Sequence, residues 1–241
     1  MRFSVAITLL LCLSARATQP SEIRAMATQL VPKVRVGDAA DFFAAWDLER
    51  PGMAAVKAAV AAGELTQAEA ALKEYFLERR QPEWRLNHWE MPKKPKGRAE
   101  EHSRYQQGEE VLAHVFDGHQ FGEMIDWNCY PKKKPDGTPD TEFSPSPVTF
   151  KHATNVLGRL YWYSLDEKYA KEFVDEVTDF VTRYPAPETY RSYGPCMWSR
   201  LRAVSPLCGT WFDCYNYFLR SKHFTPEAHA IMLRGFIEKV R

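Results

Sequence analysis

Trp127 and Asn128 lie in a stretch of the sequence that is better suited to binding than to regular structure. Residues 117–147 contain eight Gly or Pro residues and little hydrophobic periodicity. A long irregular segment inside a compact domain is often functional, and a Trp ring there can stack on a sugar. The alternative interpretation is that Trp127 anchors the segment in the core.

Arg200 and Arg202 flank Leu201, so both can lie on the same side as Trp198. A guanidinium group matches the geometry of carboxylate and sulfate oxygens. This spacing therefore indicates an anion-binding surface, with a pair of solvated surface charges as the alternative.

Asn216 and Tyr217 lie on a predicted helix whose apolar residues Trp211, Tyr215 and Phe218 recur at helical spacing and are expected in the core. The two polar side chains can therefore face away from the core. Arg159, on another predicted helix, suits a structural or a binding role equally. The residues predicted to bind a substrate are Trp127, Asn128, Arg159, Trp198, Arg200, Arg202, Asn216 and Tyr217.

No complete catalytic constellation can be read from the sequence. His114 and His119 are five residues apart with Gly118 between them, which is no recognised metal spacing. Glycine-rich phosphate loops and nucleophile elbows are absent from the sequence. We expect surface or core roles for the seven histidines, and we predict no catalytic residue, metal site or cofactor in this chain. The histidines are His88, His102, His114, His119, His152, His223 and His229.

The N-terminus predicts export. A positive Met1-Arg2 start precedes an apolar run over residues 5–13, and residues 14–17 (SARA) supply a small-residue cleavage site. We expect a signal peptide over residues 1–17, cleaved after Ala17, and a secreted or periplasmic protein. A buried N-terminal helix is the alternative.

The charges nearly balance, at +1 overall, so the composition does not indicate a nucleic-acid partner. The basic runs at 93–98 and 132–134 are interrupted or flanked by Pro and are interpreted as solvated loops, with a polyanion-binding site as the alternative. No second segment is long and apolar enough to span a membrane. Disulfide pairing stays open among four cysteines, which are Cys129, Cys196, Cys208 and Cys214.

The hydrophobic pattern that must position these residues is helical. A helix pair is predicted over residues 51–79, with Pro51 at a first helical position and a capping box from Thr66 to Glu69. Residues 81–100 read as a loop. Further helices are predicted at 101–115, 148–163, 166–184, 198–218 (interrupted near Pro206) and from 225 onward, with Asp166 and Thr225 as N-caps. The last helix has a wide apolar face that requires a partner, and we expect a further helix to follow it.

Three ordered blocks resemble the N-terminal region of the heparinase II/III family of polysaccharide lyases. The first comprises 42–52 (FFAAWDLERPG), 56–63 (VKAAVAAG) and 75–76; the second 125–128 (IDWN), 157–162 (LGRLYW) and 166–170 (DEKYA); the third Trp198, 216–218 (NYF) and 224–227 (FTPE).

The resemblance implies an incomplete (α/α) toroid of helical hairpins, truncated before the catalytic helices and the C-terminal β-sandwich. Such enzymes cleave acidic polysaccharides next to a uronic acid by β-elimination. Tyr and His act as acid and base, and Asn with a further His neutralises the carboxylate. No such residue is carried over here. The sequence also departs from the family at Thr149, Phe150, Arg202, Ser205 and Leu207.

We therefore expect an all-α chain with a signal peptide (1–17), a lead-in segment (18–40) and an incomplete toroid domain (41–241). The expected function is the N-terminal part of an exported lyase acting on heparan sulfate or alginate, with this chain alone only binding the acidic polysaccharide. The missing toroid and β-sandwich portion is an expected partner. The alternative is a non-catalytic exported helical module that binds a glycan or a protein.

Overall fold

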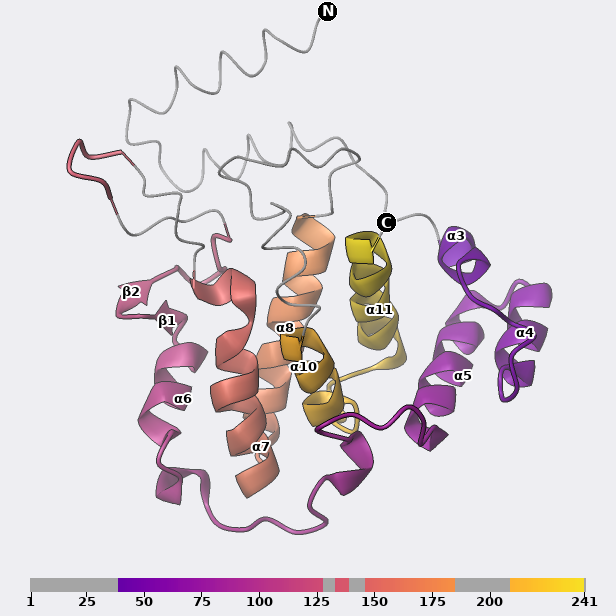
Figure 1. Cartoon of the computed structure of the whole chain (residues 1–241), viewed down its shortest axis with the longest axis horizontal. Helices are drawn as coiled ribbons and strands as arrows, with labels where there is room; N and C mark the ends of the chain where they lie inside the picture. The colour runs from indigo at the N-terminus through magenta and orange to yellow at the C-terminus, as the bar shows by residue number, and fades with distance from the viewer. Residues whose placement is uncertain (1–38, 128–132, 139–145, 185–208, 241) are drawn as a thin grey trace, which may run out of the picture. The chain divides into compact units, whose positions relative to one another are not determined.

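The computed structural model describes residues 39–127, 133–138, 146–184 and 209–240 (Figure 1). The proposed signal peptide, Asn128, Trp198, Arg200, Arg202 and the remaining family departures at 205 and 207 lie outside these residues, as do Cys129, Cys196 and Cys208. The described part is mostly helical, with only one short two-stranded sheet, which confirms the predicted all-α class. The α-helices are α3 (Ala39–Ala44), α4 (Ala54–Ala61), α5 (Leu65–Glu78), α6 (Tyr105–Leu112), α7 (Gly158–Ser164), α8 (Glu167–Arg183), α10 (Trp211–Phe218) and α11 (Pro226–Val240).

Helices α4 and α5 form the predicted hairpin, but both begin elsewhere than expected. Gly52 adopts a positive φ of 92° in a turn against the Tyr75 ring, so α4 starts after Met53 and not at Pro51. Gly63, at φ 75°, reverses the chain so that Glu64 becomes the N-cap of α5. The capping box predicted at Thr66 was therefore wrong, because Thr66 already lies inside the helix.

Helix α8 begins as predicted. The Asp166 side chain accepts a hydrogen bond from the Lys168 amide at 3.1 Å, which confirms it as the N-cap. Tyr169, Phe173 and Phe180 follow at helical spacing on the buried face. The helix predicted over 148–163 is less regular. It opens with the 3-10 turn η3 (Ser146–Thr149), continues through the π-helical turn η4 (Ala153–Leu157) and ends as α7.

Helix α11 packs against both α5 and α8, which are far apart in the sequence (Figure 1). Its N-cap is Thr225, whose hydroxyl accepts from the Ala228 amide at 3.2 Å, as predicted. Arg234 pairs with Glu69 of α5 at 3.2 Å, and Phe236 contacts Trp211 of α10. The apolar face of α11 is thus covered largely by helices of the chain itself.

The long connections contain short ordered elements. Residues 81–100 hold two 3-10 turns, η1 (His88–Glu90) and η2 (Ala99–Glu101). A two-stranded antiparallel hairpin, β1 (Val115–Phe116) and β2 (His119–Gln120), follows α6 and turns at Asp117-Gly118, a strong hairpin signal in the sequence. Among the described helices, none has the length and hydropathy needed to cross a bilayer.

Candidate functional site

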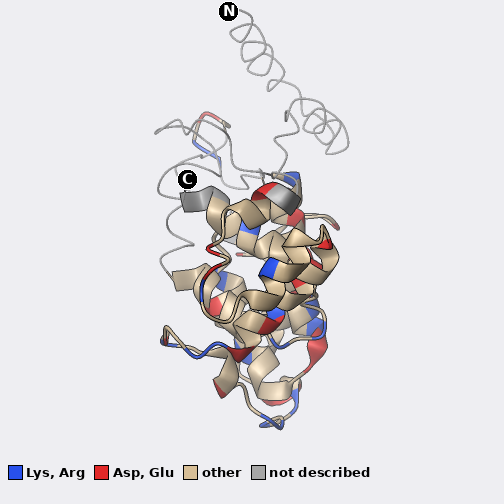
Figure 2. Cartoon of the chain, turned by 90° about the vertical axis from the view of Figure 1, so that its right-hand side faces the viewer, with Lys and Arg blue, Asp and Glu red and all other residues tan. Residues whose placement is uncertain are grey.

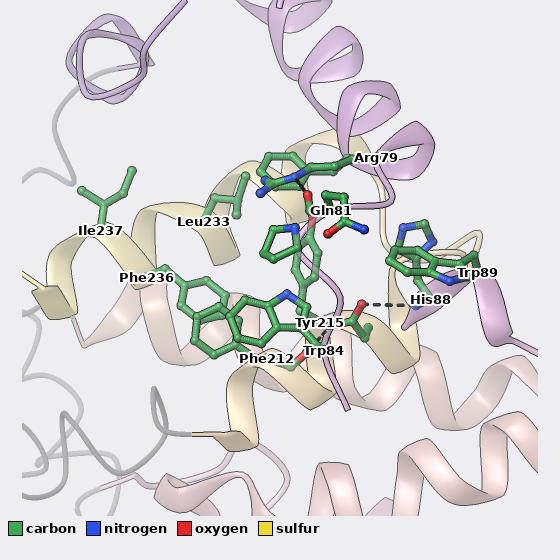
Figure 3. Close-up of a pocket in the computed structure, with 13 residues that line it drawn as sticks. Arg79, Gln81, Trp84, His88, Trp89, Phe212, Tyr215, Leu233, Phe236 and Ile237 are labelled. Atoms are coloured by element: carbon green, nitrogen blue, oxygen red, sulfur yellow. Dashed lines mark hydrogen bonds between the residues drawn. The ribbon is translucent and has the colours of Figure 1, made fainter. Parts of the chain in front are cut away.

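A pocket of about 300 Å³ lies between the C-terminal end of α5, the loop at 79–89, and helices α10 and α11 (Figure 3). Its walls are mainly aromatic and aliphatic, with a few polar groups at the rim. The lining residues are Phe76, Arg79, Gln81, Pro82, Trp84, His88, Trp89, Phe212, Tyr215, Asn216, Leu233, Phe236 and Ile237. A concave apolar site with few polar groups is the usual form of a ligand pocket.

Trp84 forms an exposed aromatic platform in this pocket. Asn87 fixes the backbone here, since its side chain accepts from the Trp84 amide and donates to the Trp84 carbonyl, both at 2.9 Å. The Trp84 ring stacks on Phe212 with centroids 4.9 Å apart, and Phe212 packs on Phe236. Because 47% of Trp84 remains exposed, the ring can accept a further flat apolar surface.

His88 and Asn216 form the polar part of the pocket wall. The His88 amide donates to Asn216 Oδ1 at 3.2 Å, shown as a dashed line in Figure 3, and Asn216 Nδ2 donates to the Phe212 carbonyl at 2.9 Å. Burial, followed by the nearby charges of Arg220 and Arg80, lowers the pKa of His88 to about 4. The ring is therefore neutral at pH 7.

Three arginines around the pocket carry no carboxylate partner within the described part of the chain. Arg79 donates to the Gln81 carbonyl and lies over the Phe76 ring. Arg80 donates to the Leu77 carbonyl at 2.9 Å and lies over Trp89, while Arg220 donates to the His88 carbonyl at 3.1 Å. These hydrogen bonds hold the side chains without neutralising them, so the rim is positive. We call Arg79, Arg80 and Arg220 the arginine rim.

A fourth arginine, Arg85, is neutralised. Its guanidinium group binds both carboxylate oxygens of Asp213, with the Nε to Oδ1 distance at 3.0 Å. Asp213 is thereby occupied by Arg85, and its charge does not cancel the arginine rim.

His88, Tyr215 and Asn216 line the same pocket, but their functional groups do not converge. The Tyr215 hydroxyl points away and contacts Nε2 of the buried His229 at 2.8 Å. Burial raises the pKa of Tyr215 well above its usual value and lowers the pKa of His229 to about 3, so both groups are neutral at pH 7. The described residues thus offer a binding surface without a matched base and carboxylate clamp.

The structure brings three of the predicted binding residues to α7 and α10. Asn216 lines the pocket, whereas Tyr217 faces α7, where its ring packs on Trp162 at 5.0 Å. Burial raises the pKa of Tyr217, and the neighbouring Arg159, whose side chain hydrogen-bonds to Tyr217, opposes this shift. Arg159 and Tyr217 are therefore neighbours, and neither lines the pocket that Asn216 lines.

Trp127 is a core residue, the second of the two interpretations of this position. It is fully buried, its Nε1 donates to Asp179 Oδ2 at 2.7 Å, and its ring packs between Phe150 and Phe180. A sugar could reach this ring only if those side chains moved. The sugar-stacking role expected of Trp127 is therefore not supported by its placement.

The sequence prediction missed the arginine rim and the two tryptophans of the pocket, Trp84 and Trp89. A usable signal was the run of residues 79–89 (RRQPEWRLNHW), in which Arg and Trp alternate just after a helix end. The contacts that make it a site come from α10, more than 120 positions later in the chain.

Two histidine–glutamate pairs, one partly buried and one buried, lie away from the pocket. His114 contacts Glu172 at 2.9 Å, and His152 contacts Glu176 at 2.6 Å, with the two acids one turn apart on α8. Hydrogen bonding to Glu172 raises the pKa of His114 to about 9. Burial raises the pKa of Glu176, and His152 opposes the shift. These contacts attach the β-hairpin and η4 to α8, and the described residues contain no cluster suited to a metal ion.

Comparison with known proteins identifies the domain. A family model described as "Heparinase II/III N-terminus" matches residues 42–240. The solved "Heparinase III-BT4657 gene product" is similar, with a TM-score of 0.66 and 24% identity over 83% of this chain and 32% of that one. The heparan sulfate lyase HepC from Pedobacter heparinus gives a TM-score of 0.64 and 24% identity over 83% of this chain and 31% of HepC. No curated protein matches the sequence. The chain thus spans about a third of the length of these solved relatives.

Proposed function

Because this chain belongs to the heparinase II/III family, we propose that it is the N-terminal helical domain of an exported polysaccharide lyase and that it binds a uronic-acid-containing polysaccharide. The proposed ligands are of the heparan sulfate or alginate type. The family match over residues 42–240 supports the domain assignment, and the similarity to HepC, a heparan sulfate lyase, supports the substrate class.

The observation that carries the binding proposal is the aromatic pocket with its positive rim. Trp84 offers an exposed ring on which the apolar face of a sugar can stack. Arg79, Arg80 and Arg220 have no carboxylate partner among the described residues, so their charges are available to uronate carboxylates and sulfates. Pairing these groups requires no existing ion pair to break.

The proposed division of labour follows from the chemistry of β-elimination. Removing the proton next to a carboxylate requires a base within hydrogen-bonding distance and a partner that neutralises the carboxylate. His88 has a pKa of about 4 and makes a weak base at neutral pH, and Tyr215 is bonded to His229 in the interior. In this proposal, the chain holds the glycan, and the base and acid come from lyase residues outside these 241.

A non-catalytic glycan-binding module is the second candidate. The same lack of a convergent base and acid among the described residues favours it. The two candidates share the binding prediction and differ in whether the gene continues into an Asn-bearing helix, a Tyr and then β-strands. Sequencing the gene beyond Arg241 distinguishes them.

The binding proposal is tested by replacing the aromatic platform. We expect Trp84→Ala to weaken the affinity of the full chain for heparan sulfate oligosaccharides about tenfold, since a stacked aromatic contact contributes on the order of 1 kcal/mol. Isothermal titration calorimetry measures this. Met124→Ala is the control, because Met124 is the other large apolar side chain exposed in the described residues, at 45%, and does not line the pocket. Equal affinities of the wild type and Trp84→Ala would remove the pocket from the proposal.

A further inference from the structure

Positive charge is concentrated in one segment of this nearly neutral chain. Residues 79–104 contain eight Lys or Arg and four Asp or Glu, whereas the whole chain is at +1. The remainder is therefore net negative. Figure 2 shows Lys and Arg along the loop at the lower end of the domain, while both signs are mixed over α4 and α5.

The loop between η1 and η2, residues 91–98, has a fixed backbone. The Lys96 amide donates to the Tyr163 carbonyl at 2.7 Å, which attaches the loop to the end of α7. Gly97 packs so closely on Tyr163 that a Cβ there would lie 2.5 Å from the phenolic oxygen. Pro92 and Pro95 restrict the backbone further. Side chains on such a loop lose less entropy on binding than those of a flexible segment.

The lysines of this loop are exposed and unneutralised. Lys93, Lys94 and Lys96 are exposed, and none forms an ion pair with a described residue. Arg98 pairs with Glu101 at 3.1 Å, so this acid is already occupied. The other acids at this end of the domain are Glu90, Glu100 and Asp166.

Two arginines extend the positive surface over Tyr163. The His102 ring packs on Tyr163 with centroids 5.0 Å apart. Burial and then the charges of Arg104 and Arg159 lower the pKa of His102, which places both guanidinium groups near this ring. Arg104 is held by Gln107 at 3.1 Å, a neutral partner.

We propose that Lys93, Lys94 and Lys96, together with Arg104 and Arg159, form a second glycan-binding surface, which we call the lysine loop surface. It takes a stretch of the same acidic polysaccharide that lies beyond the part held in the aromatic pocket, so it rests on the proposed function. The loop begins directly after η1, whose His88 and Trp89 line the pocket, and this continuity supports a single extended glycan. The ligand chemistry is a row of sulfates or carboxylates at sugar spacing.

The test compares two variants that each remove three positive charges from the full chain. The first is Lys93→Ala/Lys94→Ala/Lys96→Ala. The matched control is Lys57→Ala/Lys171→Ala/Lys222→Ala, which removes three exposed lysines from other surfaces. Affinities are measured for a heparan sulfate tetrasaccharide, a long heparan sulfate chain, an alginate chain and duplex DNA at several salt concentrations. Circular dichroism checks that both variants are folded.

We expect the loop variant to bind the long heparan sulfate chain about tenfold more weakly. The slope of log affinity against log salt concentration should become shallower by about two to three, one for each lost lysine contact, by analogy with other polyanions. Its affinity for the tetrasaccharide should match the wild type, while Trp84→Ala loses affinity for both lengths. Alginate separates carboxylate recognition from sulfate recognition, and weakened binding of either long chain supports the surface.

Equal losses in the loop variant and its control would overturn the lysine loop surface, because the effect would then be global charge. Unchanged long-chain affinity would overturn it and leave the pocket proposal standing. Duplex DNA bound as tightly as the glycan would overturn the glycan assignment. Absence of glycan binding by the wild type would overturn both proposals.

Discussion

At the scale of single residues, buried histidines in this domain serve packing and attachment, and their environments push their pKa values in opposite directions. His229 and His88 are buried without an acidic partner, so burial keeps them neutral. His114 faces Glu172, and the hydrogen bond to this acid keeps His114 charged well above neutral pH. The partner, more than the depth of burial, decides the charge.

The His114–Glu172 pair predicts a stability that depends on pH. The pKa of His114 is about 9 in the folded chain and about 6.5 when unfolded, so its contribution is fully present below pH ~6.5 and is lost as the pH rises through ~9. We expect His114→Gln to cost about 2 kcal/mol more at pH 6 than at pH 10. Urea unfolding at both values measures this, with His119→Gln, an exposed position on the same hairpin, as the control. An equal cost at both pH values would contradict the assigned pair.

Residue identities alone decided some roles and left others open. Helical spacing predicted that Asn216 and Tyr217 face away from the core, but Asn216 is buried beside Tyr215 in the pocket wall and Tyr217 packs on Trp162. The same reasoning could not separate a sugar platform from a core plug at Trp127, because its partners Phe150, Phe180 and Asp179 are remote in sequence. Trp84 was missed since its platform depends on Phe212, which no local pattern brings close.

At the scale of elements, close helix contacts are made at small residues. Gly108 of α6 is buried against Leu160 and Tyr169, and a Cβ at this position would collide with Leu160 Cδ1. Gly235 of α11 likewise approaches Val181 and Trp211. A helical glycine normally costs about 1 kcal/mol relative to alanine, so here the close packing must offset that cost.

Gly108→Ala therefore reverses the usual effect of such a substitution. The gain in helix propensity is about 1 kcal/mol, whereas a forced repacking of Leu160 costs about 1–3 kcal/mol, and we expect a net loss of up to roughly 2 kcal/mol. The midpoint of urea unfolding measures it. Gln106→Ala, at an exposed position of α6, should change stability by less than about 0.5 kcal/mol. A stabilised Gly108→Ala variant would show that α6 and α7 are not in close contact.

The sequence predicted which segments form helices, but it predicted the residue at which each helix begins only in part. The caps at Asp166 and Thr225 were identified because a polar side chain followed directly by an apolar periodicity leaves few alternatives. The N-cap predicted at Thr66 was wrong because Gly63, which has a positive φ, reverses the chain early enough for α5 to begin at Leu65. The π-helical turn η4 had no local signal, since its irregularity accommodates Phe150, whose φ is 51° in the core.

At the scale of the whole molecule, the family could be predicted from ordered sequence blocks, but the binding surface could not. Relatives of 24% identity share the fold over 83% of this chain. The arginine rim and the proposed lysine loop surface depend instead on individual charged side chains. A formal charge of +1 does not show the excess of positive charge over residues 79–104, because the negative residues lie mainly outside that segment. The net charge of a protein limits its overall electrostatic field, but it does not show where on the surface the charges lie.

Export remains a prediction that a simple measurement decides. We expect expression of the gene in a bacterial host to give a mature protein outside the cytoplasm that starts at Thr18, because residues 1–17 combine a positive start, an apolar core and a small-residue cleavage site. Mass spectrometry of the periplasmic and secreted fractions measures the N-terminus. Replacing Ala15 and Ala17 with Arg should block cleavage. Recovery of the uncleaved chain in the cytoplasm would contradict the signal peptide.

Binding and catalysis should separate when the chain is assayed by itself. In the proposed function the pocket holds a sugar next to the arginine rim. Tyr215 is bonded to His229 and the neutral His88 has a pKa of about 4, so proton abstraction beside a carboxylate lacks a base of matched pKa. We expect the full chain to bind heparan sulfate and to form no unsaturated product by ultraviolet absorbance, with an active heparan sulfate lyase as the positive control. The Trp84→Ala variant should bind about tenfold more weakly and leave the absence of product unchanged. Sustained product formation by the purified wild type that disappears in His88→Ala would contradict this separation and make the pocket a catalytic site.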